Sequence, residues 1–91
     1  MWLIEVNEIA ERAILKLDKP VRQRIFAFFR DRVESSEDPT ALAEPLKGEF
    51  HGLWRFRVGD YRVICDIQKT IRVVTVLQVG HRREIYRKSG R

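Results

Sequence analysis

The segment from Leu53 to Ile67 alternates apolar and polar side chains on both sides of a Gly59-Asp60 dipeptide. Such alternation predicts two β-strands, each with one apolar face. Glycine at the first position of a two-residue loop supplies the positive φ of a type II′ turn, so the dipeptide predicts a tight hairpin. The expected cross-strand pairs are Val58 with Tyr61, Arg57 with Arg62, and Phe56 with Val63.

The two faces of this hairpin differ sharply in chemistry. The apolar face carries Trp54, Phe56, Val58, Tyr61, Val63 and Cys65. The other face carries Arg55, Arg57 and Arg62, with no acidic residue expected between them. Like charges directly opposite each other destabilise an antiparallel pair, whereas a phosphate above them would be held by charge-assisted, bidentate hydrogen bonds. The hairpin therefore predicts binding of an external anion.

Two amphipathic helices are expected before the hairpin. Asn7 can cap the first, which has Glu8 and Glu11 near its positive end. Its predicted apolar face consists of Ile9, Ala10, Ala13, Ile14 and Leu17. Pro20 suits the first turn of the second helix. The second helix is expected to bury Val21, Ile25, Phe28, Phe29 and Val33.

The remaining pattern completes an α+β fold. Residues 1–6 read as a first strand, residues 35–45 as a polar connector with one helical turn at Ala41-Leu42, and residues 71–79 as a central strand covered on both faces. We expect two N-terminal antiparallel helices packed on a small, mainly antiparallel twisted sheet, in the order β-α-α-β-β-β with a short C-terminal segment. Ninety-one residues fit a single domain, residues 1–91.

Composition narrows the class of protein. The chain is 44% hydrophobic and 34% charged, and no apolar run approaches the length that spans a bilayer, so no membrane partner is expected. The opening residues have no basic leader and do not read as a signal peptide. Together with the single cysteine, Cys65, expected as a buried and inert thiol, this predicts a cytoplasmic protein.

Positive charge is concentrated in the C-terminal half. Residues 1–45 have a formal charge of −2 and residues 46–91 a charge of +7, which together give the net charge of +5. Most cations of the second half are arginines, which suit phosphate recognition better than lysines do. Such a field attracts polyanions, so nucleic acid is the leading predicted partner.

Four segments in this order and spacing resemble a known family. They are Leu46-Lys47-Gly48, Leu53-Trp54-Arg55-Phe56-Arg57, Gly59-Asp60-Tyr61-Arg62-Val63 and Val79-Gly80-His81-Arg82-Arg83-Glu84-Ile85-Tyr86. Over essentially the whole chain they resemble the RelE-type branch of the RelE/ParE superfamily of bacterial toxins. The resemblance implies a type II toxin that enters the ribosomal A site and cleaves mRNA. It also implies a cognate antitoxin, for which an arginine-rich groove suggests an acidic, partly disordered segment.

RNA cleavage without a metal proceeds by attack of the 2′-hydroxyl on the adjacent phosphate. It needs a base, an acid for the leaving oxygen, and positive charge near the developing dianion. The candidate catalytic residues are Arg55, Arg57, Arg62, His81, Arg82 and Tyr86. The candidate RNA-binding residues are Lys47, Arg83, Arg87 and Lys88. The sequence has no cluster with the spacing of metal ligands, so neither a metal nor a cofactor is expected.

The identity of the base is left open by this resemblance. RelE has lysines at the positions that correspond to Arg55 and Arg57, and a guanidinium is a poor proton acceptor. His81 is the expected substitute, because imidazole titrates near neutrality and related toxins use a C-terminal histidine. Glu49 resembles a position from which some relatives supply a carboxylate.

Two other functions share this fold. One is a ParE-like toxin that inhibits DNA gyrase without nuclease activity, and the other is a toxin-fold protein that binds nucleic acid without catalysis. A gyrase inhibitor has no need of an arginine triad beside a terminal His-Arg-Arg, so these residues favour the nuclease. Trp54 and Tyr61 are expected in the core, and His51 in a loop.

Overall fold

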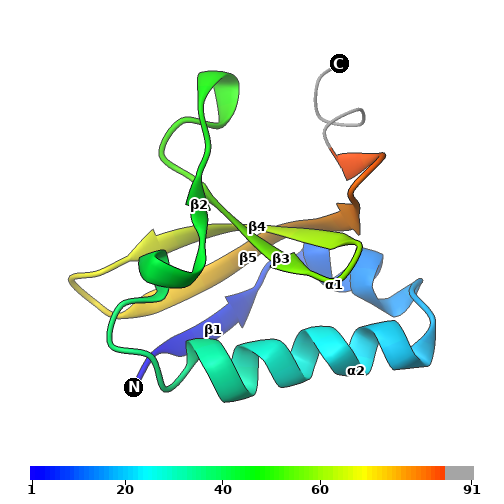
Figure 1. Ribbon diagram of the computed structural model, residues 1–91, viewed down its shortest axis with the longest axis horizontal. Coiled ribbons are helices and arrows are strands. Elements are labelled where there is room, and N and C mark those ends of the chain that lie inside the picture. Colours follow the sequence, from blue (N-terminus) through cyan, green and yellow to red (C-terminus); the bar gives the residue numbers. More distant parts are fainter. Residues whose placement is uncertain (86–91) are drawn as a thin grey trace.

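A five-stranded sheet with two helices on one face forms the molecule, and the computed structural model describes residues 1–85 of it (Figure 1). The strands are β1 Leu3–Val6, β2 Glu44–Pro45, β3 Trp54–Val58, β4 Tyr61–Gln68 and β5 Val73–His81. Their order in the sheet is β1-β5-β4-β3-β2, with β1 parallel to β5 and the other neighbours antiparallel. The predicted α+β fold is confirmed, with β2 as one strand more than predicted.

The β3–β4 hairpin has the predicted register. Val58 pairs with Tyr61, and Arg57 pairs with Arg62. Gly59 has a φ of 61°, and Asp60 has no positive φ, as a type II′ turn requires. The alternate side chains Phe56, Val58, Val63 and Cys65 join the helices in the main core, while Trp54 and Tyr61 are half-buried. The arginines between them therefore lie on the open face.

The helices form where capping and proline predict them. Helix α1, Glu8–Leu15, begins at Asn7, whose side-chain oxygen accepts a hydrogen bond of 2.8 Å from Ala10 N–H. Helix α2, Lys19–Phe28, has Pro20 in its first turn and continues as a single π turn, Phe29–Val33. Neither helix has the length and apolarity to cross a membrane, within the part of the chain that the structure describes.

Most of the predicted apolar positions of the helices are buried. Ala10, Ile14, Ile25, Phe29 and Val33 lie in the core, and Ala13, Leu17, Val21 and Phe28 pack against it. Ile9 is the exception, since 69% of its surface is exposed, and its predicted burial is wrong. Phe28, Phe29 and Phe56 meet edge to face, which joins α2 to β3.

The polar connector ends in a strand that the sequence did not predict. A 3₁₀ turn, Pro39–Leu42, includes the expected turn at Ala41-Leu42, and β2 follows it at once. Glu44 of β2 pairs with Arg55 of β3. A further 3₁₀ turn, Gly48–Phe50, belongs to the loop that stands away from the sheet after β2 (Figure 1). Two residues are too few to show a periodicity, so β2 has no pattern of its own.

Strand β5 is central, as predicted, but only one of its faces is fully covered. Val74, Val76 and Val79 lie under the helices, whereas the alternating residues Val73 and Thr75 are half-exposed. The expected burial on both faces is therefore wrong. An irregularity opposite Ile64 and Cys65 inserts one extra residue into β5, and the strand continues to His81 rather than ending at Val79.

The cap of α1 provides a test of the helix boundary. Replacing Asn7→Ala removes the acceptor of the Ala10 N–H and should lower the free energy of unfolding by about 1 kcal/mol. Urea denaturation should show a lower midpoint with an unchanged slope. Asn7→Asp preserves an acceptor and should stay close to the wild type. Equal midpoints for Asn7→Ala and the wild type would contradict a stabilising cap.

Candidate nucleic-acid interface

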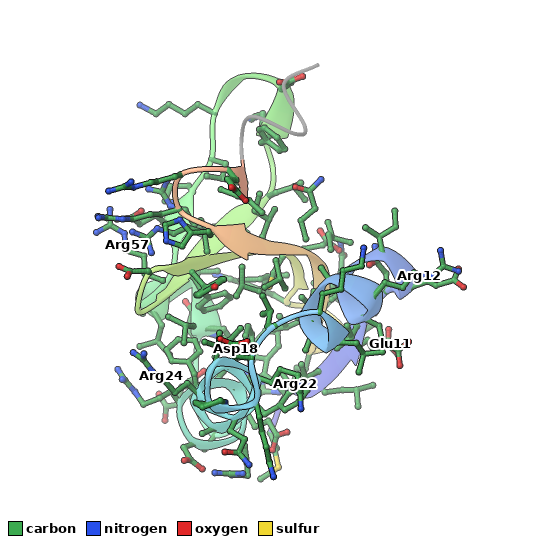
Figure 2. The ribbon with its side chains drawn as sticks, turned by 90° about the vertical axis from the view of Figure 1, so that its right-hand side faces the viewer. Glu11, Arg12, Asp18, Arg22, Arg24 and Arg57 are labelled. Atoms are coloured by element: carbon green, nitrogen blue, oxygen red, sulfur yellow. The ribbon has the colours of Figure 1, made fainter. Side chains whose placement is uncertain are left out.

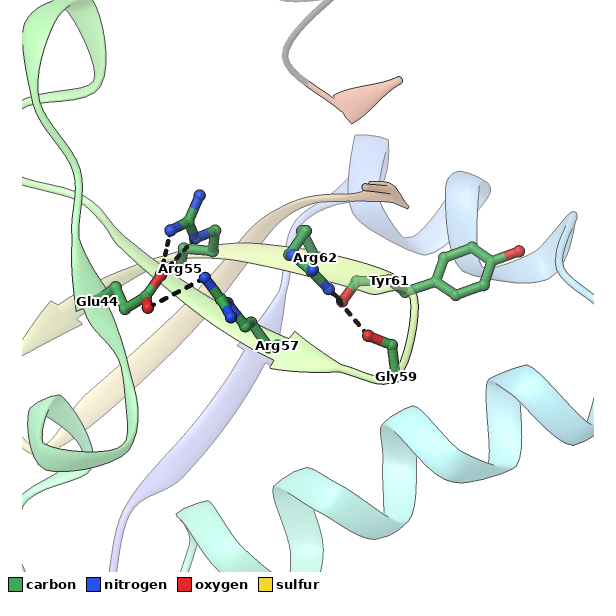
Figure 3. A network of polar contacts seen from close by, with 6 residues as sticks. All are labelled: Glu44, Arg55, Arg57, Gly59, Tyr61 and Arg62. Carbon is green, nitrogen blue, oxygen red and sulfur yellow. Dashed lines mark hydrogen bonds and ion pairs between the residues drawn. The ribbon is translucent and has the colours of Figure 1, made fainter. Parts of the chain in front are cut away.

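Three arginines share the face of the sheet that the helices leave open (Figure 3). Arg55 and Arg57 come from β3 and Arg62 from β4, and Arg57 lies directly opposite Arg62. Strand alternation places all three on the side away from the main core. The face predicted from the hairpin pattern therefore exists, with its like-charged pair.

A carboxylate from β2 lies among these arginines (Figure 3). Arg55 Nε donates to Glu44 Oε1 at 2.9 Å, and Arg55 Nη2 contacts the same oxygen closely. Arg57 Nη2 lies 3.3 Å from Glu44 Oε2. The expectation of a face without an acidic residue is wrong, because the pairing of β2 with β3 brings Glu44 across from a sequence distance of eleven residues.

Arg62 is held differently from the other two. Its Nη1 donates to the carbonyl oxygens of Gly59, at 2.9 Å, and of Tyr61, at 3.0 Å. The guanidinium is thus turned toward the hairpin loop, where two backbone carbonyl oxygens stabilise its positive charge. This arrangement, together with Glu44, explains how the fold tolerates Arg57 opposite Arg62.

Glu44 is kept ionised by its surroundings. The hydrogen bond from Arg55 lowers the pKa of Glu44 below its usual 4.5, partial desolvation opposes this, and the charges of Arg55, Arg57 and Arg62 lower it further. The carboxylate therefore carries its charge at neutral pH. Its ion pairs weaken only when the pH falls through this lowered pKa.

Arg82 lies at the tip of the hairpin. Its backbone N–H donates to Asp60 O at 2.8 Å, and its Nε lies 3.8 Å from Asp60 Oδ1. Arg83 and Lys47 are exposed, Arg83 in the turn after β5 and Lys47 in the loop after β2. Three candidates, Tyr86, Arg87 and Lys88, lie outside the described residues.

His81 is not brought together with Arg55 and Arg57. It pairs with Tyr61 across β4 and β5, and the two rings meet edge to face at 5.5 Å. The Tyr61 ring is directed away from the arginines (Figure 3). Both rings line a groove of about 440 Å³ against α1, on the helix side of the sheet. His81 Nδ1 accepts the Arg83 N–H at 3.2 Å, so a neutral ring carries its proton on Nε2.

The other chemically active side chains lie apart from the arginine face. Glu49 and His51 are exposed in the loop that follows β2. Cys65 is buried in the main core, as predicted, and burial raises the pKa of its thiol. Among residues 1–85, no group of three or more His, Cys, Asp or Glu side chains could hold a metal ion.

Glu44 is the site residue that sequence reasoning missed. Its signal was the neighbouring proline, because a proline beside an otherwise extended segment is typical of an edge strand. Pairing of that edge strand with β3 would have placed a carboxylate beside Arg55. The polar composition of residues 35–45 instead predicts a connector, and Glu49 is the carboxylate that the family resemblance points to.

Comparisons with known proteins identify the family of this chain. Residues 4–86 match the family described as the ParE toxin of the type II toxin–antitoxin system parDE. Toxin RelG of Mycobacterium tuberculosis is 36% identical over 88 residues, which cover 96% of this chain and 98% of that protein.

Solved structures share the fold. One is the toxin–antitoxin complex RelBE2 of M. tuberculosis, with a TM-score of 0.78 and 25% identity over 88% of this chain and 96% of that one. Another is the archaeal RelE–RelB complex of Pyrococcus horikoshii, with a TM-score of 0.71 and 28% identity over 91% and 97%. The chain is therefore a toxin of a type II toxin–antitoxin system and belongs to the RelE/ParE superfamily.

Proposed function

We propose that this toxin is a ribosome-dependent endoribonuclease that cleaves translated mRNA. The observation that supports this most directly is the open sheet face, where Arg55, Arg57 and Arg62 surround one ionised carboxylate, Glu44. Three guanidinium groups around one carboxylate leave an excess of positive charge, which suits a phosphate. The carboxylate, held in place beside them, supplies a proton acceptor. Translation would stop because the message is cut.

Glu44 is the best placed general base for this reaction. It would accept the proton of the ribose 2′-hydroxyl, whose oxygen then attacks the adjacent phosphorus. Arg57 and Arg62 would stabilise the charge that develops on the phosphate oxygens. A carboxylate with a lowered pKa is a weak base, so the reaction depends on accurate orientation of the hydroxyl, which the ribosome would supply.

The acid that protonates the leaving 5′-oxygen would come from the C-terminal segment. Arg82 stands at the hairpin tip, beside Arg62, and would hold the scissile phosphate. Tyr86 follows closely in sequence and is the proposed proton donor or base-stacking residue. Lys47, Arg83, Arg87 and Lys88 would bind the flanking RNA backbone. His81 lies on the helix side of the sheet, so Glu44 replaces it as the proposed base.

A cognate antitoxin is the second proposed partner. The solved relatives include toxin–antitoxin complexes with RelB. We propose that an acidic, partly disordered antitoxin segment covers the arginine face and competes with RNA for the same guanidinium groups.

A non-nuclease toxin is the second candidate function. The specific observation that favours it is the family match itself, which is described for ParE toxins. A ParE-like protein would inhibit DNA gyrase and would need no proton acceptor on the sheet. Mapping of mRNA ends after induction in growing bacteria separates the two, since the nuclease yields ends within translated codons and the gyrase inhibitor yields DNA damage.

Removal of a phosphate contact should abolish most of the toxicity. Arg57→Ala and Arg62→Ala should each slow mRNA cleavage on the ribosome about 100-fold, because each removes positive charge from the developing dianion. Growth of bacteria expressing either variant should recover. Lys69→Ala is a matched control, since Lys69 is an exposed cation that pairs with Asp38 far from this face. Full toxicity of both arginine variants would contradict the proposed site.

Removal of the proposed base should slow the chemical step while preserving binding. Glu44→Gln should reduce the single-turnover cleavage rate about 100-fold, with unchanged or tighter affinity for programmed ribosomes. Because the pKa of Glu44 is lowered, the wild-type rate should stay constant between about pH 8 and about pH 5.5. A rate that falls several-fold within this pH range would contradict Glu44 as the base.

Free RNA should be a poor substrate. Since the proposed base is weak, the toxin needs an external scaffold to align the 2′-hydroxyl with the phosphate. Purified toxin should cut an mRNA at A-site codons when ribosomes are present and leave the same RNA largely intact without them. Rapid cleavage of free RNA would refute this dependence.

A further inference from the structure

An arginine of helix α2 touches the hairpin tip from the helix side. A β-carbon placed on Gly59 would lie 2.7 Å from Arg24 Nη2 and 3.1 Å from Arg24 Cζ, so the guanidinium lies against the backbone of the turn. Arg24 and Arg57 are directed to the same side of the molecule (Figure 2). Glycine at position 59 therefore has two effects: it allows the positive φ of the turn, and its lack of a β-carbon allows the close approach of Arg24.

The hairpin tip collects more positive than negative charge. Arg62 bonds the carbonyl of Gly59 from the open face, and Arg82 lies beside the carboxylate of Asp60. Arg24 approaches the same two-residue loop from α2. Asp60 is the acidic residue of the turn, and it is largely exposed. Three guanidinium groups thus meet at a turn that contributes one carboxylate.

Arg24 also differs from the other arginines of its helix and of the π turn. Arg22 donates to the Leu17 carbonyl at 2.8 Å, Arg30 pairs with Asp31 at 2.9 Å, and Arg32 lies over the Phe28 ring at 5.9 Å. Within residues 1–85, the Arg24 side chain makes neither an ion pair nor a hydrogen bond. A cation that is held close to other cations and has no internal counter-charge is ready to bind an external anion.

We propose that Arg24 binds an RNA phosphate outside the cleavage site, so that the bound ribose-phosphate backbone crosses the hairpin tip from the arginine face toward α2. This inference rests on the proposed nuclease function, which places the scissile phosphate on the open face. RNA carries a phosphate at every nucleotide, so its next phosphates must lie beside that face. The hairpin tip is the adjoining surface with excess positive charge, and a guanidinium fork suits a phosphate.

RNA fits this surface better than an acidic peptide does. Arg24 and Arg62 contact opposite sides of one tight turn. A ribose-phosphate chain presents anionic groups at a regular spacing and can satisfy both arginines in succession. Carboxylates of a disordered segment have no such fixed spacing, and binding of the segment also requires it to lose conformational entropy.

The test compares Arg24→Ala with Arg30→Ala, which removes a similarly exposed cation that already has a partner. Binding of each full-length variant is measured to ribosomes programmed with an mRNA whose A-site codon carries 2′-deoxy sugars, so that cleavage cannot occur. Arg24→Ala should weaken binding about threefold or more and lower the slope of log affinity against log salt by about 0.7. Arg30→Ala should match the wild type, and Arg24→Lys should recover part of the salt slope.

Two versions of the message identify the source of the phosphate. If the loss disappears with an mRNA that ends at the A-site codon, the phosphate belongs to the message beyond that codon, which supports the proposed path of the backbone. If the loss persists with this shortened mRNA, the message beyond the codon is excluded as the source, and a path of its backbone across the hairpin tip is overturned. The inference is overturned if Arg24→Ala binds programmed ribosomes as tightly as the wild type does, or if Arg30→Ala weakens this binding equally. It is also overturned if Arg24→Ala weakens binding of an acidic antitoxin peptide but not of the programmed ribosome. If the wild type still cleaves an unmodified mRNA in any of these cases, only the inference about Arg24 fails and the nuclease proposal stands. A loss of RNA binding without any cleavage by the wild type would overturn the nuclease proposal alone.

Discussion

The alternation of side chains across the β3–β4 hairpin is the constraint on which the rest of the structure depends. The type II′ turn at Gly59 fixes the register, and a shift of either strand by one residue would turn its arginines toward the core and its core residues toward water. With the register fixed, Phe56 and Val63 anchor the helices on one face. The opposite face is then free to carry charge, so the register set by a single turn keeps the apolar face and the charged face apart.

Crowded positive charge is tolerated because the sheet provides partial neutralisation. Glu44 holds Arg55 and Arg57, and carbonyls of the turn hold Arg62. None of these contacts is fully buried, so they orient the guanidinium groups more than they stabilise the fold. The result is a set of guanidinium groups with fixed positions and an excess of positive charge. Such preorganisation is what a site for a charged transition state requires.

The sequence predicted those elements whose determinants are local. The hairpin register, the Asn7 cap and the start of α2 at Pro20 each follow from a few neighbouring residues, and the structure confirms them. Long-range pairing was not predictable in the same way. Glu44 enters the site through a two-residue edge strand, and the extra residue in β5 alters the parity that decides on which face His81 lies. The roles of the site residues in catalysis stay predictions.

The parallel pairing of β1 with β5 links the beginning of the chain to its end. Leu3 lies opposite Val73, and Asn7 N–H donates to Val76 O at 3.0 Å. Strand β5 is the last of the five strands in the sequence, so β1 has no neighbour in the sheet until β5 pairs with it. Formation of the sheet requires closure of a loop of about seventy residues, a slow and non-local step. Because β4 also pairs with β5, the arginine face of β3 and β4 gains its neighbour on that side in the same step that joins β1 to the sheet.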